Sequence, residues 1–422
     1  MELYIHIPFC AKKCGYCDFP SFPAEGKLQK RYVEALLREI RSFSGMEQRV
    51  SSIYIGGGTP SILPAECIGE ILSAVGESFS VEEGAEISME ANPGTVQPGS
   101  LSLYRRAGVN RLSLGCQSAD NAELKRLGRI HSFEEFRESF AYAREAGFAN
   151  INVDLMSGLP GQTEDSWERS LSKIASLGPE HISAYSLIIE EGTPFYEKYH
   201  AVSGMIAGGE PDRLVQKLEE ERYHLREEEQ LPGEETERQM YDRTEEVLTG
   251  YGFHRYEISN YAKKGRECRH NVGYWTGTPY LGLGLGASSY TGCLRFRGTD
   301  DIGRYLKAHG DPAGNERMIE LFDRVNFSPD ELRDILARDG REEAECLGER
   351  DQMAEFMILG LRLVAGVSSS EFRRRFGQEM MKVYGSTIRK YEDVGLLREE
   401  GDRLILTRRG LSLSNTVMAD FL

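Results

Sequence analysis

The feature that most constrains the fold is a repeated alternation of strand-like and helix-like patterns between residues 3 and 187. Short apolar runs alternate with longer stretches, of about 10 to 15 residues, whose apolar side chains recur at helical spacing. The alternation occurs about six times, which predicts right-handed crossovers and a parallel sheet. The predicted strands span residues 3–7, 52–55, 86–89, 111–114, 150–155 and 181–187.

Polar residues stand at the ends of three successive predicted strands, namely Glu90, Gln117 and Asp154. A single residue of this kind is best interpreted as a cap on the helix that follows. Three in succession favour a shared site at the carboxyl ends of the strands, where barrel enzymes place their active sites. The pattern therefore fits a partial or full barrel better than an open sheet.

Three cysteines, Cys10, Cys14 and Cys17, follow the first predicted strand at the spacing C-x3-C-x2-C. A 4Fe-4S cluster is normally held by four thiolates. Three thiolates therefore leave one iron free to chelate a small molecule through nitrogen and oxygen.

Two other interpretations of these cysteines have to be weighed. Structural zinc usually recruits two separated ligand pairs, and no second pair stands at suitable spacing. A disulfide framework needs an oxidising compartment, and the other five cysteines are scattered along the chain. Spacing alone leaves the cluster and zinc both open. The scattered cysteines are Cys67, Cys116, Cys268, Cys293 and Cys346.

The charge balance bears on partners and location. The 422 residues include 51 basic and 67 acidic ones, for a formal net charge of −16, which argues against a nucleic acid or an anionic membrane as partner. No apolar stretch approaches about 18 residues, and no signal-peptide pattern is present. Because a thiolate-held cluster needs a reducing compartment, we expect a cytoplasmic protein without stable membrane insertion.

The length favours more than one domain, because a single core usually stops growing below this size. We expect a barrel domain over residues 1–230, an extension of its sheet over 231–309, and a helical, winged-helix-like domain over 310–422. In the last of these, residues 400–402 form a predicted hairpin turn, and its few basic residues do not favour DNA binding. The acidic segment 210–240 is polar enough to be an exposed helix.

The run YIHIPFCAKKCGYCDF, residues 4–19, resembles the radical S-adenosylmethionine (SAM) superfamily and its coproporphyrinogen-oxidase-like branch. The resemblance implies an α/β fold, namely a partial (β/α)6 barrel with an extended sheet and a C-terminal winged-helix-like domain. It also implies a 4Fe-4S cluster on the three cysteines, with SAM bound to the open iron and cleaved to a 5'-deoxyadenosyl radical. The SAM-contacting residues that it implies are Tyr4, Phe19, Gly57, Gly58, Thr59, Glu90, Gln117, Arg129 and Asp154.

Residues 270–275 read HNVGYW, which resembles a motif associated with haem in the haem-chaperone members of this branch. A lone histidine is more often structural than a ligand. However, imidazole is a common axial ligand of haem iron, and Tyr274 and Trp275 offer flat apolar surfaces. We therefore predict that His270 helps to bind haem.

Two departures from the oxidase pattern favour a chaperone. Phe19 stands where the oxidase carries a fourth cysteine, and only three residues precede Tyr4. The resemblance thus implies a protein that binds haem and a SAM-ligated cluster and passes haem to an acceptor protein, served by an electron donor protein. The two departures count against decarboxylase activity. We also expect self-association as a homodimer. The alternatives are oxygen-independent oxidative decarboxylation of coproporphyrinogen III, and a structural role for zinc or a cluster.

Overall fold

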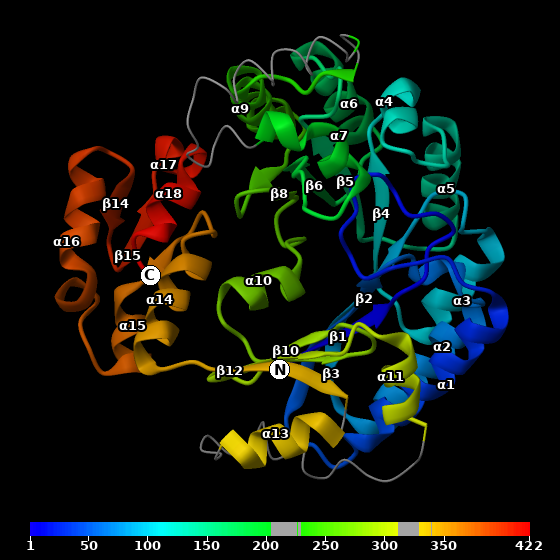
Figure 1. Ribbon diagram of the computed structural model, residues 1–422. Coiled ribbons are helices and arrows are strands. Elements are labelled where there is room, and N and C mark those ends of the chain that lie inside the picture. Colours follow the sequence, from blue (N-terminus) through cyan, green and yellow to red (C-terminus); the bar gives the residue numbers. More distant parts are fainter. Residues whose placement is uncertain (204–225, 227–228, 311–328, 339) are drawn as a thin grey trace.

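The computed structural model describes residues 1–203, 226, 229–310, 329–338 and 340–422. Within them the chain forms one twelve-stranded sheet in the order β12-β11-β10-β9-β1-β2-β3-β4-β5-β6-β8-β7, and a separate three-stranded sheet (Figure 1). The strands of the large sheet are β1 (Glu2–Ile7), β2 (Arg49–Gly57), β3 (Ser80–Ala91), β4 (Arg111–Gln117), β5 (Ile151–Ser157), β6 (His181–Ser186), β7 (His254–Arg255), β8 (Asn260–Ala262), β9 (Tyr280–Leu283), β10 (Ser288–Tyr290), β11 (Leu294–Gly298) and β12 (Arg341–Cys346).

Strands β1 to β6 lie side by side in chain order and are all parallel. This confirms the parallel βα architecture that the alternating pattern predicts. In the described part of the chain the outermost strands, β7 and β12, do not pair with each other, so the sheet is an open, partial barrel.

Helices cover the outer face of the parallel strands (Figure 1). The alternation within β1 explains why: Leu3, Ile5 and Ile7 are fully buried in the main core, which the apolar faces of the helices complete. The helices of this half are α1 (Gly26–Ser42), α2 (Ala65–Ser78), α3 (Pro98–Ala107), α4 (Asn121–Arg126), α5 (Phe133–Glu145), α6 (Glu164–Ser176) and α7 (Pro194–Ser203), with a 3-10 turn at Pro60–Ile62.

The opposite, concave face of the same strands is unusually polar. On β1 the residues that alternate with the apolar ones are Glu2, Tyr4 and His6, and the neighbouring strands continue this pattern with groups such as Glu90 and Asp154. Because side chains alternate between the faces of a strand, the apolar core and the polar interior are set by the same short sequences.

The large sheet extends beyond the six parallel strands at both edges. Strands β8 and β7 add antiparallel to β6, whereas β9 pairs parallel to β1 and leads to the antiparallel strands β10, β11 and β12. Strand β12 comes from beyond residue 310, where the sequence predicts a domain boundary, so the large sheet reaches past that point. Its sequence, REEAEC, is polar because it is an edge strand, and such a pattern gives little strand signal.

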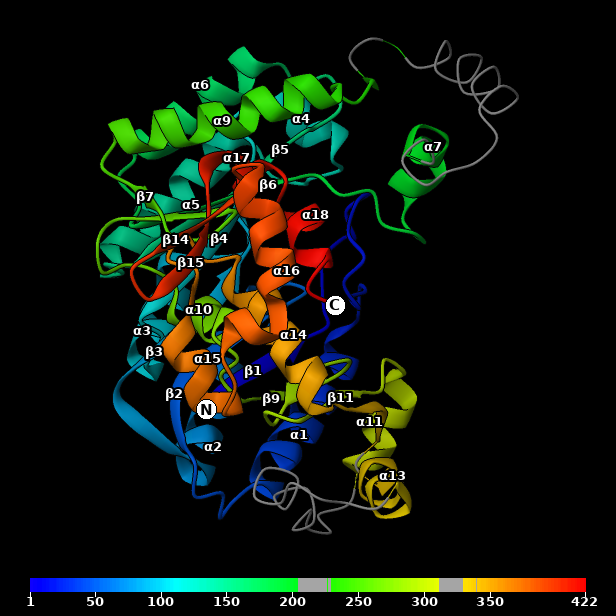
Figure 2. The same cartoon turned by 90° about the vertical axis from the view of Figure 1, so that its left-hand side faces the viewer.

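Helices from residues 234–338 pack around the large sheet and the helices of its parallel half. Helix α9 packs against α6 (Figure 2), where the indole Nε1 of Trp167 donates to the Met240 carbonyl at 3.2 Å and to Thr244 at 2.9 Å. Most of the predicted acidic segment, residues 210–240, lies outside the described residues, and its last part belongs to α9. These helices are α9 (Glu234–Gly250), α10 (Arg269–Trp275), α11 (Ile302–Ala308) and α13 (Pro329–Arg338).

The C-terminal module, residues 349–422, has its own apolar core around Phe372, Ile388 and Leu404. A hairpin turns at residues 401–402, as predicted, and helices pack around it in the winged-helix-like arrangement that the sequence indicates. Its elements are α14 (Glu349–Gly360), β13 (Val367–Ser368), α15 (Ser369–Phe376), α16 (Met380–Asp393), β14 (Leu397–Glu400), β15 (Arg403–Leu406), α17 (Arg408–Ser412) and α18 (Ser414–Ala419). None of the helices in the described ranges combines the length and the apolar character needed to cross a bilayer.

Candidate functional site

A cavity of about 430 Å³ opens at the carboxyl ends of the parallel strands. This volume lies within the range of about 300–1,000 Å³ that is typical of ligand pockets. One side of the cavity is the loop that follows β1, and the other sides are the ends of β2 to β6. The predicted residues that line it are Cys10, Cys14, Cys17, Phe19, Gly57, Gly58, Thr59, Glu90, Gln117, Arg129 and Asp154.

Backbone hydrogen bonds hold the cysteine loop against the strands. The Cys10 amide donates to the Phe22 carbonyl at 3.2 Å, and the Gly15 amide donates to the Leu127 carbonyl at 3.3 Å. The three cysteines line one cavity. Burial raises the pKa of the Cys17 thiol. Among the described residues no three His, Cys, Asp or Glu side chains are arranged to hold a single metal ion.

Arg129 links the cysteine loop to the strand ends. Its Nη1 donates to the Cys14 sulfur at 3.7 Å, and its Nη2 donates to the Asn92 side-chain oxygen and to the Gly115 carbonyl, both at 2.7 Å. Its Nε is buried and has no partner among the described residues. A half-buried cation with a spare, buried Nε donor beside the Cys14 thiol suits an anionic cluster and a carboxylate ligand.

Glu90 and Asp154 face the cavity from β3 and β5. Glu90 accepts hydrogen bonds from the Tyr54 hydroxyl at 2.9 Å and from the Gly57 amide at 3.1 Å. Burial, and then the nearby charge of Asp154, raises the pKa of Glu90 to about 7. The two carboxyl groups therefore share a buried environment in which polar or cationic ligand groups are favoured.

Gln117 ends β4 in a left-handed conformation, with a φ of 68°. This conformation is uncommon outside glycine and concentrates at functional sites. Its side-chain oxygen accepts a hydrogen bond from the Tyr185 hydroxyl at 2.8 Å, so Tyr185 holds the amide at the cavity wall.

Two of the predicted site residues do not line this cavity. Tyr4 lies below it, where its hydroxyl donates to Nδ1 of His6 at 3.0 Å. The Nε2–H of His6 in turn donates to the Pro20 carbonyl of the cysteine loop at 3.1 Å. Because a carbonyl only accepts, this pair of bonds fixes the tautomer of His6, and burial lowers its pKa to about 4.

Sequence reasoning missed three residues that support the site: His6, Tyr54 and Asn92. Asn92 donates to the Thr59 hydroxyl at 2.7 Å, and that hydroxyl lies 3.5 Å from the Cys10 sulfur. His6 and Tyr54 occupy the inward positions of their strands, alternating with buried apolar residues. That alternation is the signal that could have identified them.

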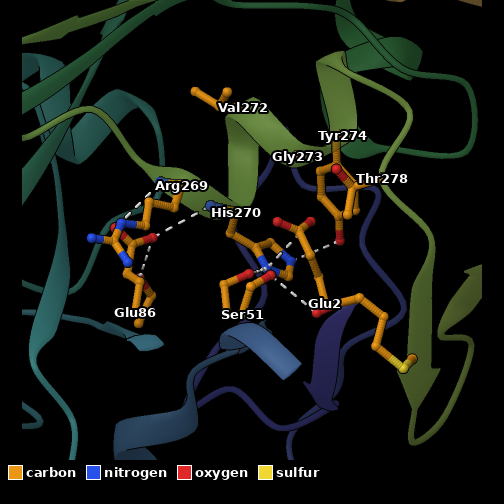
Figure 3. A network of polar contacts seen from close by, with 12 residues as sticks. Glu2, Ser51, Glu86, Arg269, His270, Val272, Gly273, Tyr274 and Thr278 are labelled. Atoms are coloured by element: carbon orange, nitrogen blue, oxygen red, sulfur yellow. Dashed lines mark hydrogen bonds and ion pairs between the residues drawn. The ribbon is translucent and has the colours of Figure 1, made fainter. Parts of the chain in front are cut away.

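His270, the other residue outside the cavity, lies on α10, close to Glu2 at the start of β1 (Figure 3). Its ring is fully buried and stacks on Tyr54 at 5.2 Å between centroids. Its Nδ1 is hydrogen-bonded to Ser52 at 2.8 Å and its Nε2 to the Tyr274 hydroxyl at 3.0 Å. Both ring nitrogens are therefore engaged, and iron ligation by His270 requires that either the Ser52 bond or the Tyr274 bond break.

Helix α10 packs closely over Glu2 at the start of β1 (Figure 3). An added Cβ at Gly273 would overlap the Glu2 carboxylate, so the glycine allows this approach with Glu2 in its present position. One carboxylate oxygen of Glu2 lies 3.8 Å from His270 and is buried without a hydrogen-bond partner among the described residues.

We expect this buried carboxyl group to destabilise the protein as the pH rises. Burial raises the pKa of Glu2 to about 8 from an ordinary 4.5. Between these values the unfolded chain releases the proton that the folded chain keeps, so the free energy of unfolding falls with increasing pH. Replacing Glu2 by Gln should reduce this fall between pH 5 and 8 by about 1–3 kcal/mol, measured by urea denaturation across that range.

The pH profile of Glu2→Gln has to be compared with that of the parent protein, because buried neutral histidines make the free energy of unfolding rise with pH. Burial lowers the pKa of His270 to about 3, so its contribution rises with pH up to about 6.5. The substitution Glu47→Gln, at an exposed position, should leave the profile unchanged. Equal slopes for Glu2→Gln and the parent protein would contradict the buried, protonated state of Glu2.

Comparison with known proteins agrees with this geometry. The sequence matches the family models of the Radical SAM superfamily over residues 4–174 and of the HemN C-terminal domain over residues 347–413. The solved structure of coproporphyrinogen III oxidase (HemN) from Escherichia coli has the same fold, with a TM-score of 0.74 over 100% of this chain and 89% of that chain, at 21% identity.

Similarity to curated proteins identifies a narrower family within this superfamily. Heme chaperone HemW from Lactococcus lactis is 33% identical over 99% of this chain and 96% of its own length. Heme chaperone HemW from Bacillus subtilis is 34% identical over 99% of this chain and 98% of its own length. With this identity over nearly the whole chain, and with the cysteine loop and strand-end residues gathered at one cavity, the chain belongs to the HemW family of radical SAM proteins.

Proposed function

We propose that the protein is a haem chaperone that binds haem and a SAM-ligated 4Fe-4S cluster and delivers haem to an acceptor protein. The observation that carries the cluster and SAM part is the convergence of Cys10, Cys14 and Cys17 with Arg129 on one cavity. The haem part rests on the likeness to the HemW relatives over nearly the full length.

The residues at the cavity fit both groups. Cys10, Cys14 and Cys17 would hold three irons of the cluster. Gly57, Gly58 and Thr59 present backbone groups at the same wall, and Arg129 supplies a half-buried cation for the SAM carboxylate. When bound, the cluster and SAM supply one-electron chemistry. The protein side chains orient SAM and exclude water from it.

Asp154 provides a test of the SAM site that does not involve the cysteines. It lines the cavity and accepts hydrogen bonds from Ser113 at 3.0 Å and Asn152 at 2.7 Å, which fix its carboxylate. We expect Asp154→Ala to weaken SAM binding by about 1–3 kcal/mol, because a charge-assisted hydrogen bond is lost. Equilibrium dialysis of SAM against the anaerobically reconstituted protein measures this effect.

Two controls accompany the measurement of SAM binding by Asp154→Ala. The iron and sulfide content of Asp154→Ala should equal that of the parent protein. Asp300→Ala, at an exposed position that does not line the cavity, should bind SAM normally. Unchanged SAM affinity in Asp154→Ala would remove Asp154 from the site.

The haem function is tested by binding and by transfer. Haemin should give a saturable Soret band with the protein, and the band should move to a haem-free cytochrome when the two are mixed. Loss of coproporphyrinogen III in a parallel anaerobic assay would instead support the oxidase, the alternative function. His270→Gln addresses the proposed axial ligand: a shifted Soret band supports ligation, and an unchanged band assigns His270 the role of anchoring α10.

The partners follow from this proposal. A reductive cycle at the cluster requires an electron donor protein, and delivery requires a haem-accepting protein. Self-association as a homodimer is a separate part of the proposal, and sedimentation equilibrium measures it directly.

A further inference from the structure

A second cavity, of about 820 Å³, lies between α10, the turn after β10 and the C-terminal module. It shares no lining residue with the cavity at the cysteine loop. Its volume is also within the range of about 300–1,000 Å³ for ligand pockets. We call it the α10–α14 cavity, and its principal lining residues are Val272, Trp275, Tyr290, Phe356, Leu359 and Arg375.

The walls of the α10–α14 cavity are largely apolar and aromatic. On α14, Gln352, Phe356 and Leu359 follow one another at intervals of four and three residues, so a single helical face borders the space. Trp275 from α10 and Tyr290 from β10 border it from the large sheet. Aromatic rings of this kind offer extended flat contact to a planar apolar molecule.

Two buried polar atoms in these walls lack partners within the described residues. They are Nε1 of Trp275 and one carboxylate oxygen of Glu355, whose other oxygen pairs with Arg295 at 2.8 Å. Buried polar groups are normally hydrogen-bonded, so each such exception calls for an explanation. Both atoms belong to residues that line the cavity, so a ligand bound there would lie beside them.

Two exposed arginines from the C-terminal module, Arg375 and Arg403, also line this cavity. Arg375 donates from Nη2 to the Thr276 carbonyl at 2.9 Å, which joins the module to the end of α10. Arg403 donates to the described residues through Nη1, to the carbonyls of Ala365 and Gly366. Arg375 also donates from Nε to the Glu371 carboxylate, which lines the cavity too, at 2.7 Å. Because a guanidinium carries five N–H donors, both arginines keep N–H groups beyond these bonds with which to bind carboxylates.

Helix α10 separates this cavity from the interior of the barrel. His270 and Tyr274 are bonded to each other, and His270 reaches Ser52 on the concave face of the sheet. Val272 and Trp275 line the α10–α14 cavity. The residues of the HNVGYW motif thus have two structural roles. The histidine and tyrosine anchor the helix, and the tryptophan forms a wall of the α10–α14 cavity.

We propose that the α10–α14 cavity holds haem, with the porphyrin ring against Trp275 and Phe356 and the propionates at Arg375 and Arg403. This rests on the proposed haem function. The aromatic walls match a planar apolar ring. Of the two cations that match its carboxylates, Arg375 is paired with Glu371 and Arg403 is bonded to backbone carbonyls. Haem would then lie outside the barrel, separated by α10 from the barrel interior and from the cavity that holds the cysteine loop.

The test is a haemin titration of the full-length protein, followed at the Soret band. The double substitution Arg375→Gln and Arg403→Gln should weaken haemin binding at least tenfold, since two charge-assisted contacts are removed. The matched control is Arg373→Gln with Arg374→Gln, which removes two charges from α15, the helix that carries Arg375, at positions that do not line the cavity. The control should bind haemin as the parent protein does.

A second variant adds volume instead of removing charge. Leu359→Trp places a larger ring in the cavity and should also weaken haemin binding at least tenfold, with iron, sulfide and SAM binding retained as evidence of a folded protein. If the parent protein binds haemin and both cavity variants bind it equally well, the location is wrong and the chaperone function stands. If the parent protein itself binds no haemin, the proposed function fails and this inference fails with it.

Discussion

Replacing Cys14 by alanine should abolish the iron–sulfur cluster after anaerobic reconstitution. Cys14 lines the cavity, where its sulfur accepts a hydrogen bond from Arg129, and the other cysteines that line this cavity are Cys10 and Cys17. A cluster already held by only three thiolates has no spare ligand. The variant should therefore lose the broad visible absorption of the cluster and nearly all bound iron and sulfide. Cys10→Ala and Cys17→Ala should behave in the same way.

Cysteines elsewhere in the chain provide matched controls. Cys67 lies on α2 and Cys346 on β12, and neither lines the cavity. Cys67→Ala and Cys346→Ala should reconstitute with the iron and sulfide content of the parent protein. A full cluster in the combined Cys10, Cys14 and Cys17 alanine variant would overturn the assignment, because the remaining cysteines would then have to hold it.

The parallel half of the fold was predictable because local sequence and burial agree there. Each predicted strand carries apolar residues at alternate positions, as with Leu3, Ile5 and Ile7, and these enter the main core. The strand ends then gather residues that are far apart in the chain, so Glu90 and Asp154 meet at one cavity. Parallel order alone accounts for that meeting, since all carboxyl ends lie at one edge.

The surroundings of α10 were not predictable in the same way. Which atoms His270 contacts depends on Ser52, more than 200 residues earlier in the chain, and no local pattern records that pairing. A motif match identifies HNVGYW, but it does not show that the histidine and tryptophan lie on different sides of the helix. The same limit applies to β12, a polar edge strand that follows its partner β11 in the chain only after α11 and α13.

Replacing Gly58 by alanine should disrupt the cysteine loop more severely than removal of any single ligand around SAM. An added Cβ would lie 2.6 Å from the Phe9 carbonyl oxygen and 2.9 Å from the Ile7 carbonyl oxygen, and these backbone atoms cannot rotate away. The backbone there is also tied in place, because the Gly58 amide donates to Ile7 at 2.8 Å and the Thr59 amide donates to Phe9 at 2.7 Å. The end of β1 must therefore move, and Cys10 follows it directly.

We expect Gly58→Ala to lower the free energy of unfolding by about 3 kcal/mol, at the upper end of the usual cost of overpacking, and to lose most of its bound iron and sulfide. The matched control is Gly76→Ala on α2, where an added Cβ meets nothing within 4 Å. Because alanine has the higher helix propensity, that control should gain about 0.5–1 kcal/mol. Urea denaturation and iron analysis of both variants measure the two effects. A Gly58→Ala protein with normal cluster content would show that the cysteine loop does not depend on its contact with the glycine-rich turn.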